Sequence, residues 1–343
     1  MRIVMVAGGT GGHIFPALAL ADELIKRGAE IVWVGRPQGL ESELALKRGF
    51  RFEPVPAAGF SGLGILGKAR WLWAFLRAFI RSCSLVRGLD PDAVIAAGGY
   101  VSAAPLLCAE LSGKAFFLLE QNRIPGRVTK LFAWRARGCF FAFPPVMGTG
   151  DNCIVTGNPL RKEITAGHRH DDGRTVLVLG GSQGARALNL AAIDLAAALT
   201  NFRFIIITGR RDYNLVKSRI RSGNCELVDF TDRPEEFYTQ ATIAISRAGG
   251  MVLSELVTFG VPTILVPFPY ATDKHQDANA EYLASVGAAI VLDQNRLPGL
   301  TSLVCSLMTD DARRREMSEA AYRAASPDAA QVIAERIAGC LAG

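Results

Sequence analysis

Apolar runs of strand length alternate with longer amphipathic segments through most of the chain. Continuous apolar strands separated by helices are typical of a parallel sheet covered on both faces, because each strand is then buried on both sides. The pattern therefore predicts a doubly wound α/β fold. The strand-length runs are Ile3–Val6, Ile31–Val34, Ala93–Ala96, Ala115–Leu119, Thr175–Leu179, Phe204–Thr208, Ala241–Ile245 and Thr263–Val266. The helix-length segments include Phe15–Arg27, Leu66–Arg87, Arg186–Thr200 and Met251–Gly260.

The alternation restarts at about Arg174, after a polar stretch with linker composition, TGNPLRKEITAGHRHDDGR. Two similar α/β domains explain this restart, and we expect them over residues 1–160 and 161–327. In such a pair of domains a ligand is expected in a deep cleft between the two. The last segment, 328–343, follows Pro327 and has the pattern of an amphipathic helix, which we expect to pack back on the first domain.

Composition narrows the class of protein only slightly. The 343 residues suit about two domains, and the net charge of +6 permits anionic partners such as nucleotides or an acidic membrane surface. The seven cysteines are scattered and contain no CxxC pair, which favours a reduced, cytosolic chain. The first apolar run breaks after Ala7 into glycines that a signal peptide would not contain, so we interpret it as a strand.

Glycine-rich turns stand where several predicted strands end and helices begin: Gly8–Gly12, Gly98–Gly99, Gly180–Gly184 and Gly249–Gly250. Such turns let the backbone approach a phosphate, and the helix that follows offers unpaired N–H groups, although sharp strand-to-helix turns also need glycine for purely structural reasons. The chain has no GxxxxGK[ST] motif, and Ile14 replaces the third glycine of GxGxxG. The second strand ends in Gly35-Arg36, without an acidic residue for a ribose. A P-loop ATPase and a nicotinamide dehydrogenase are therefore disfavoured.

Together these stretches closely resemble the MurG family of peptidoglycan enzymes, and the resemblance runs through both domains. The matching segments are GGTGGHIFPALALADEL, AAGGYVSAAP, LEQNRIPGRVTKLFAWRA, TGNPLR, LGGSQGARALN and SRAGGMVLSELVTFGVPTILVPFPYATDKHQDANA. The resemblance implies a GT-B fold and inverting transfer of N-acetylglucosamine from UDP-GlcNAc to the C4 hydroxyl of the muramoyl sugar in lipid I. The products would be lipid II and UDP, in the synthesis of peptidoglycan, on which cell shape and division depend. It implies no cofactor and no essential catalytic metal. The partners implied are the two substrates, an anionic membrane surface at the cytoplasmic face of the inner membrane, and other cell-wall synthesis proteins.

The resemblance also assigns residues to the donor UDP-GlcNAc. Arg161 and Ser182 would contact its nucleotide and diphosphate, Glu255 would accept hydrogen bonds from the ribose diol, and Gln276, after His275, would bind sugar hydroxyls. The carboxylate of Glu255 only accepts hydrogen bonds, which suits a diol, although a glutamate early in a helix can also serve simply as a helix-terminus charge. Arg161 can stabilise charge on the leaving diphosphate or be a solvated linker cation. The remaining donor residues implied are Thr10, Gly11, Gly12, Asn122, Gly250, Met251 and Val252, with the amides of 250–252 carrying more of the diphosphate because the family's frequent threonine is missing.

His13 is the candidate general base, because the imidazole pKa of about 6.5 lies near working pH. It can equally position the acceptor or a phosphate, or cap its helix. The acceptor's own diphosphate is expected at a second turn, formed by Gly98, Gly99, Tyr100 and Ser102. Leu119 stands where many family members have histidine, so that position is not treated as catalytic. The DxD-like Asp90-Pro91-Asp92 precedes its strand, so we interpret it as a strand-entry turn and predict no metal site.

The segment 66–88 mixes aromatic residues with arginines, and its apolar residues are too interrupted to span a bilayer. It can lie in a membrane interface, or it can be a buried helix whose arginines reach solvent. A lipid-linked acceptor favours membrane contact. The residues assigned to that contact are Trp71, Trp73, Phe75, Arg77, Phe79 and Arg81.

Three other functions remain open: a glycolipid glycosyltransferase, a UDP-GlcNAc epimerase, and a nucleotide-sugar-binding protein without activity. An epimerase needs no lipid and gives the basic aromatic segment no purpose. The presence of His13 and of the acceptor turn favours an enzyme over a sensor. Nucleic-acid binding is disfavoured, because the arginines do not accompany a recognisable nucleic-acid-binding module.

Overall fold

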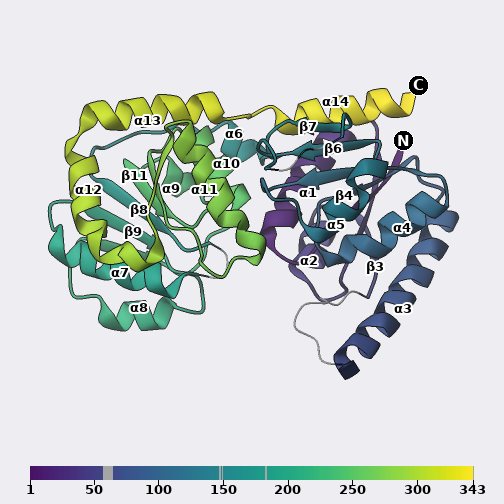
Figure 1. Cartoon of the computed structure of the whole chain (residues 1–343), viewed down its shortest axis with the longest axis horizontal. Helices are drawn as coiled ribbons and strands as arrows, with labels where there is room; N and C mark the ends of the chain where they lie inside the picture. The colour runs from purple at the N-terminus through teal and green to yellow at the C-terminus, as the bar shows by residue number, and fades with distance from the viewer. Residues whose placement is uncertain (57–64, 147, 149, 182–183, 343) are drawn as a thin grey trace. The chain divides into compact units, whose positions relative to one another are not determined.

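The computed structural model describes residues 1–56, 65–146, 148, 150–181 and 184–342. The chain divides into two compact units, Met1–Arg161 with Pro327–Gly343, and Lys162–Ser326. Each unit contains a parallel sheet with helices on both faces (Figure 1). Arg161 is the last residue of the first unit before the chain enters the second.

The first unit is built on a sheet in the order β3-β2-β1-β4-β5-β6-β7, and every pairing within it is parallel. Its strands are β1 (Arg2–Val6), β2 (Glu30–Gly35), β3 (Arg51–Pro54), β4 (Ala93–Ala96), β5 (Ala115–Glu120), β6 (Gly138–Phe141) and β7 (Cys153–Val155). The central strands are buried on both sides, which explains their continuous apolar sequences. β3, β6 and β7, which lie at the two sides of this sheet, were not predicted from the sequence.

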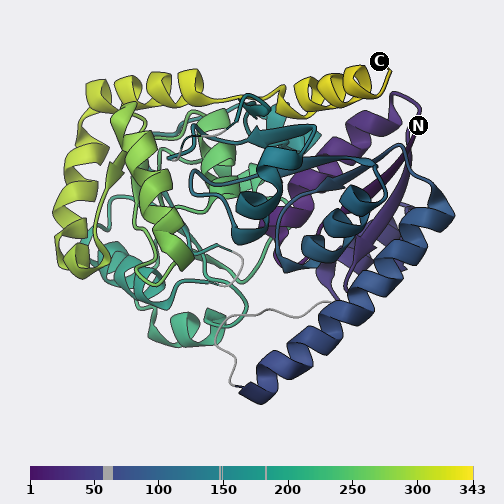
Figure 2. The same cartoon turned by 45° about the vertical axis from the view of Figure 1, so that its right-hand side comes forward.

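Helices cover both faces of this sheet. They are α1 (Gly11–Ile25), α2 (Leu40–Lys47), α3 (Ile65–Leu89), α4 (Ala103–Leu111), α5 (Arg127–Phe132) and α14 (Ala329–Ala342), with short 3-10 helices η1 (Tyr100–Ser102) and η2 (Ala133–Arg135). One apolar core joins the sheet to α1, α2 and α14, and the core on the other face joins it to α3, α4 and α5. The last helix contributes Ile333 and Ile337 to the first core, and Arg27, just after α1, contacts Glu335 at 3.0 Å. Figure 2 shows α3 along the outside of this unit.

Two cysteines are paired, which corrects the expectation of a wholly reduced chain. Cys83 of α3 and Cys108 of α4 form a disulfide, with their Cα atoms 5.2 Å apart. The two residues stand 25 positions apart in sequence, so no local motif could indicate the pairing. They meet because α3 and α4 pack side by side on the same face of the sheet.

The second unit has its own parallel sheet, in the order β10-β9-β8-β11-β12-β13. Its strands are β8 (Thr175–Leu179), β9 (Arg203–Ile207), β10 (Cys225–Val228), β11 (Ile243–Ser246), β12 (Thr263–Leu265) and β13 (Ala289–Val291). Its helices are α6 (Lys162–Thr165), α7 (Arg186–Ala198), α8 (Tyr213–Arg219), α9 (Glu235–Tyr238), α10 (Gly250–Thr258), α11 (His275–Ser285), α12 (Leu300–Thr309) and α13 (Asp311–Ala324), with η3 (Thr272–Lys274) and η4 (Gln294–Gly299). The core of this unit joins β8, β9, β11 and β12 to α7, α12 and α13.

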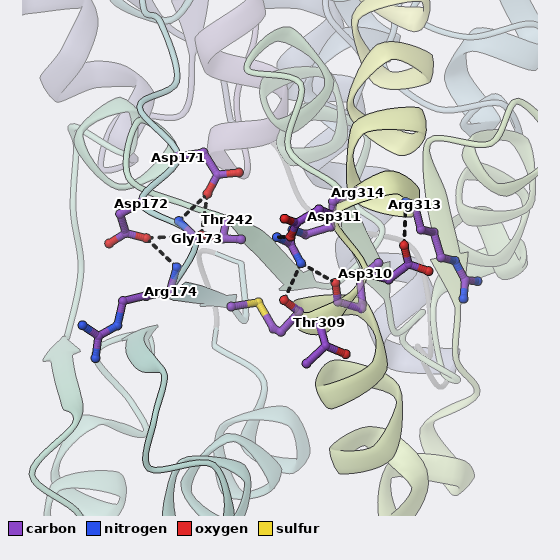
Figure 3. Close-up of polar contacts among 12 residues, drawn as sticks. Asp171, Asp172, Gly173, Arg174, Thr242, Thr309, Asp310, Asp311, Arg313 and Arg314 are labelled. Carbon is purple, nitrogen blue, oxygen red and sulfur yellow. Dashed lines mark hydrogen bonds and ion pairs between the residues drawn. The ribbon is translucent and has the colours of Figure 1, made fainter.

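The polar stretch before β8, which its composition indicated to be a linker, fixes the entry to that strand. Asp172 accepts hydrogen bonds from the backbone of Arg174 and Thr175, and Asp171 accepts from the hydroxyl of Thr242 (Figure 3). The same view shows Asp310, whose carboxylate caps α13 at the backbone N–H of Arg313. The contacts of Asp171 and Asp172 thus anchor the start of the second unit within that unit.

One difference from the sequence expectation affects the site. The first helix begins at Gly11 rather than Phe15, which places two glycines and His13 in its first turn. Among the described residues, none of the helices is long and apolar enough to cross a membrane.

Candidate functional site

The first glycine turn follows β1 and opens directly into α1. Thr10 is the N-cap, and its carbonyl accepts hydrogen bonds from the backbone of His13 at 3.0 Å and Ile14 at 3.3 Å. The amides of Gly11 and Gly12 belong to the first turn of the helix and have no partner within it. This geometry suits an anion, because the amides and the helix dipole act in the same direction.

His13 lies against the second glycine turn. A Cβ built on Gly98 would stand 3.0 Å from the Cδ2 atom of His13, and Gly98 itself has a φ of +90°. Both facts require glycine at this position. The Nδ1 atom of His13 is 3.5 Å from the Thr10 hydroxyl. The partly exposed imidazole therefore stands between the two turns predicted to hold phosphate.

The residues assigned to the acceptor diphosphate have different environments. Ser102 is fully buried and its hydroxyl donates a hydrogen bond to the Gly98 carbonyl at 2.7 Å, so it shapes the turn from below. Tyr100 is exposed, and its hydroxyl accepts a hydrogen bond from Arg36. Of these two side chains, Tyr100 is the one placed to meet a ligand.

Asn122 is positioned by a buried carboxylate that the sequence analysis did not single out. Glu120, at the end of β5, accepts hydrogen bonds from the Gly126 amide at 2.9 Å, the Thr129 hydroxyl at 2.7 Å and the Asn122 amide at 3.2 Å. Burial raises the pKa of the Glu120 carboxyl, against the effect of these hydrogen bonds. The sequence did contain a signal for this residue, because Glu120 is a glutamate at the end of an otherwise apolar strand.

Arg161 packs within the first unit. Its guanidinium lies over the ring of Phe15 in α1, 5.0 Å from the centroid. This cation–π contact attaches the end of the unit to the helix that carries His13. Arg161 is partly buried and is therefore not a fully solvated linker cation, the alternative that the sequence left open.

The second unit presents its glycine turn between β11 and α10. Gly249 is the N-cap and its carbonyl accepts from Leu253 at 3.1 Å. The amides of Gly250, Met251 and Val252 occupy the first turn, where an N–H group cannot bond within the helix. Ser182, predicted to bind the diphosphate, lies outside the described residues.

Glu255 lies on the second turn of α10 and is 8% exposed. Its Oε2 atom accepts a hydrogen bond of 2.7 Å from the hydroxyl of Tyr238, which is 2% exposed. A carboxylate held by a buried tyrosine has a fixed orientation, which a solvent-exposed helix-terminus charge would not need. Tyr238 is a residue that sequence reasoning missed, since it precedes Glu255 by 17 positions with no shared motif.

Gln276 has its amide oxygen occupied by the backbone. The oxygen accepts hydrogen bonds from the amides of Phe268 at 2.9 Å and Ala248 at 3.3 Å. The side-chain NH₂ group is therefore the part suited to a ligand, and Gln276 would act toward a sugar as a donor. His275 contacts the Thr272 carbonyl through Nδ1 at 2.8 Å.

Arg247 connects the ends of two strands in this unit. It is buried and donates to the carbonyls of Val266 at 3.0 Å and Pro267 at 3.1 Å. Burial lowers the pKa of this guanidinium. A cation directly after a buried strand, in SRAGG, was a signal that the sequence analysis did not use.

Acidic residues that suggested a metal motif have other roles. Asp92 accepts a hydrogen bond from the Arg2 amide at 2.6 Å, and Asp90 pairs with Lys114 at 2.6 Å. They form the strand-entry turn that their position before β4 predicts. Within the described part of the chain, histidine, cysteine, aspartate and glutamate side chains form no group of three or more that could hold a metal ion.

Two doubly wound units, each with glycine turns at the carboxyl edge of a parallel sheet, form the GT-B fold, which this chain shares with solved glycosyltransferases. Residues 3–141 match the glycosyltransferase family 28 N-terminal domain, and residues 175–333 match the glycosyltransferase family 28 C-terminal domain. The chain belongs to glycosyltransferase family 28 and, within it, to the MurG family. The fold and the family expected from the sequence are thus confirmed.

Individual relatives support this assignment. A transferase of Methylococcus capsulatus, named UDP-N-acetylglucosamine--N-acetylmuramyl-(pentapeptide) pyrophosphoryl-undecaprenol N-acetylglucosamine transferase, is 38% identical and covers 97% of both chains. The crystal structure of Acinetobacter baumannii MurG superposes with a TM-score of 0.80 at 27% identity, covering 98% of this chain and 99% of that one. A putative UDP-N-acetylglucosamine 2-epimerase from Listeria monocytogenes shares the fold alone, with a TM-score of 0.72, 14% identity and coverage of 98% and 95%.

Proposed function

We propose that this protein transfers N-acetylglucosamine from UDP-GlcNAc to the C4 hydroxyl of the muramoyl sugar of lipid I, giving lipid II and UDP. The observation that carries the proposal is the near full-length similarity to curated transferases of that name, 38% identical over 97% of the chain. The fold alone would not separate a transferase from an epimerase, because both occur among its structural relatives.

The donor is assigned to the second unit. The first-turn amides of α10 suit its diphosphate, and each contact of this type is worth roughly 0.3–1 kcal/mol when exposed and about 2 when partly buried. Glu255 would accept from the ribose hydroxyls, and the Gln276 amide would donate to a sugar hydroxyl. Ser182 keeps its predicted role at the diphosphate.

The acceptor is assigned to the first unit, with its diphosphate at the turn of Gly98–Tyr100, beside Gly11–Gly12. His13 would take the proton of the C4 hydroxyl as that oxygen forms its bond to the anomeric carbon. The bond from this carbon to the UDP oxygen breaks at the same time, through an oxocarbenium-like transition state, and the configuration is inverted. Arg161 and Asn122 would stabilise the charge that develops on the leaving diphosphate.

Membrane contact is assigned to α3, with one change from the sequence prediction. Phe75 and Phe79 pack against the core of the first unit, and Trp71 stacks on Phe75 at 5.4 Å. The outward apolar face consists of residues exposed by 43–67%: Leu72, Trp73, Leu76 and Ile80. Arg77 and Arg81 flank this face, which matches a helix lying in an anionic interface. The proposed location is the cytoplasmic face of the inner membrane, among other cell-wall synthesis proteins.

A transfer assay tests the function. Purified protein is incubated with UDP-[14C]GlcNAc and a lipid I analogue, and the label is followed into the lipid fraction. The proposal expects a labelled disaccharide lipid together with UDP. Label that stays in a nucleotide sugar with changed configuration at C2 would identify an epimerase, and binding without turnover would identify a sensor.

A further inference from the structure

An ion pair with a buried carboxylate and a partly exposed guanidinium lies beside the two glycine turns of the first unit. Arg36 follows β2 and Glu41 lies in α2, and the Nε atom of Arg36 is 2.9 Å from the Oε1 atom of Glu41. The Glu41 side chain is fully buried, whereas the Arg36 side chain is 33% exposed. Space for the carboxylate comes from three glycines, at each of which a Cβ would collide with Glu41: Gly8, Gly35 and Gly39. The pair therefore presents a cation to solvent and hides its anion.

The same guanidinium connects both glycine turns. Its Nη2 atom donates to the Gly9 carbonyl at 3.4 Å, and its Nη1 atom donates to the Tyr100 hydroxyl at 3.3 Å. Strands β2, β1 and β4 are neighbours in the sheet, so their carboxyl ends meet at one edge. Arg36 reaches from the first of these strand ends to the third, across the turn that opens α1.

The position of Glu41 makes this cation necessary for an anion site. A Cβ on Gly8 would stand 2.6 Å from the Glu41 Oε1 atom, so a carboxylate lies directly beneath the first turn. Alone, its charge would repel a phosphate bound at the amides above it. The hydrogen bond to Glu41 raises the pKa of Arg36, so the compensating charge is retained.

We propose that Arg36 binds the diphosphate of the lipid acceptor, with Glu41 and Tyr100 as positioning residues that hold its guanidinium in place. This inference rests on the proposed function, which supplies a diphosphate-linked acceptor. Guanidinium carries five N–H donors in a planar fork, and three are engaged by Glu41, Gly9 and Tyr100 in the described part of the chain. The remaining two suit phosphate oxygens.

The test uses geranyl diphosphate and geraniol as probes, because they differ only in the diphosphate. Dissociation constants are measured by calorimetry for the wild-type protein and for Arg36→Gln. We expect Arg36→Gln to weaken geranyl diphosphate binding by about 10- to 100-fold, the loss typical of one charge-assisted hydrogen-bonding group. Geraniol and UDP binding should not change.

Two further variants separate this role from a structural one. Arg36→Gln leaves Glu41 buried without its partner and can destabilise the fold, so Arg36→Gln/Glu41→Gln removes both charges together. We expect the double variant to bind geranyl diphosphate better than Arg36→Gln, because the repulsive carboxylate is gone, but worse than wild type. Arg36→Lys keeps the charge without the fork and should fall between wild type and the double variant.

The matched control is Arg2→Gln. Arg2 contacts Glu30 at 2.9 Å, the distance found in the Arg36 pair, but at the amino edge of the same sheet. An equal loss of geranyl diphosphate binding in Arg2→Gln, unchanged binding in Arg36→Gln, or no binding to wild type would overturn the inference. Lipid transfer by the wild type is measured in parallel. Its absence would count against the proposed function, whereas an active wild type with unchanged acceptor KM in Arg36→Gln would count against Arg36 alone.

Discussion

The hydrogen bond between Tyr238 and Glu255 gives a quantitative test of how the donor site is built. Tyr238→Phe removes one hydroxyl from a contact of 2.7 Å between two buried side chains. Water cannot easily replace the donor there, so the loss should approach the value for a hydrogen bond to a charged group, about 1.5–3 kcal/mol. For a unit of this size each kcal/mol lowers Tm by roughly 2–4 °C, which predicts a fall of about 3–12 °C in calorimetry.

The same variant should weaken UDP binding, because the Glu255 carboxylate, proposed to bind the ribose, is no longer held in one orientation. In a Glu255→Ala background, Tyr238→Phe should have little further effect on UDP affinity, since the two residues act as one unit. Tyr322→Phe is the control, because Tyr322 belongs to the same unit and is 50% exposed. Unchanged Tm and UDP affinity in Tyr238→Phe, or independent effects in the double variant, would show that Tyr238 does not hold Glu255 for UDP binding.

Three further changes test other parts of the account. Gln276→Glu keeps an acceptor for two backbone amides and loses the NH₂ donor, so UDP-GlcNAc affinity should fall while UDP affinity, measured by calorimetry, stays the same. Burial raises the pKa of Glu41, but its hydrogen bonds lower the pKa by more, so the net value lies below the ordinary one. The ionised carboxylate therefore stabilises the fold at pH values above the unfolded-state pKa. That contribution disappears as pH falls through the folded-state pKa, and the Tm difference between wild type and Glu41→Gln should shrink on acidification; a constant difference would exclude this linkage. Trp73→Ser/Ile80→Ser should reduce sedimentation with anionic vesicles roughly tenfold or more, whereas Leu46→Ser, equally exposed on α2, should not; equal losses would reject α3 as the membrane face.

Periodicity predicted the central strands well, because strands that are buried on both sides consist almost entirely of apolar residues. β1, β4 and β8 are buried along most of their length, so apolar runs identified them directly. β3, with the sequence RFEP, lies at the edge of its sheet and is only partly buried. Its strand conformation follows from pairing with β2, which no local pattern records.

The start of α1 shows a similar limit. Glycine has a low intrinsic preference for helix, so the pattern alone favours a start after Gly11 and Gly12. In the structure Thr10 caps the helix before both glycines, and their amides occupy the first turn. Tertiary packing of the apolar residues that follow, such as Leu18 and Leu24, outweighs this local preference.

Residues that position other side chains in the site were harder to predict than residues proposed to contact the ligands themselves. Glycine turns have a recognisable spacing, and the resemblance to a known family implied the proposed roles of Glu255 and Gln276. Arg36 and Glu41 were not identified, because the burial of Glu41 depends on three glycines from separate turns. Tyr238 of α9 meets Glu255 of α10 only through a tertiary hydrogen bond, which no local sequence pattern records.

The central claim, inverting transfer to lipid I, is tested most directly by the structure of the product. Lipid formed from UDP-GlcNAc and a lipid I analogue is purified and analysed by mass spectrometry and by the anomeric proton coupling in NMR. We expect one added N-acetylhexosamine, joined to the C4 oxygen of the muramoyl sugar in the β configuration. An α linkage, attachment at another hydroxyl, or an unmodified lipid beside consumed UDP-GlcNAc would contradict it.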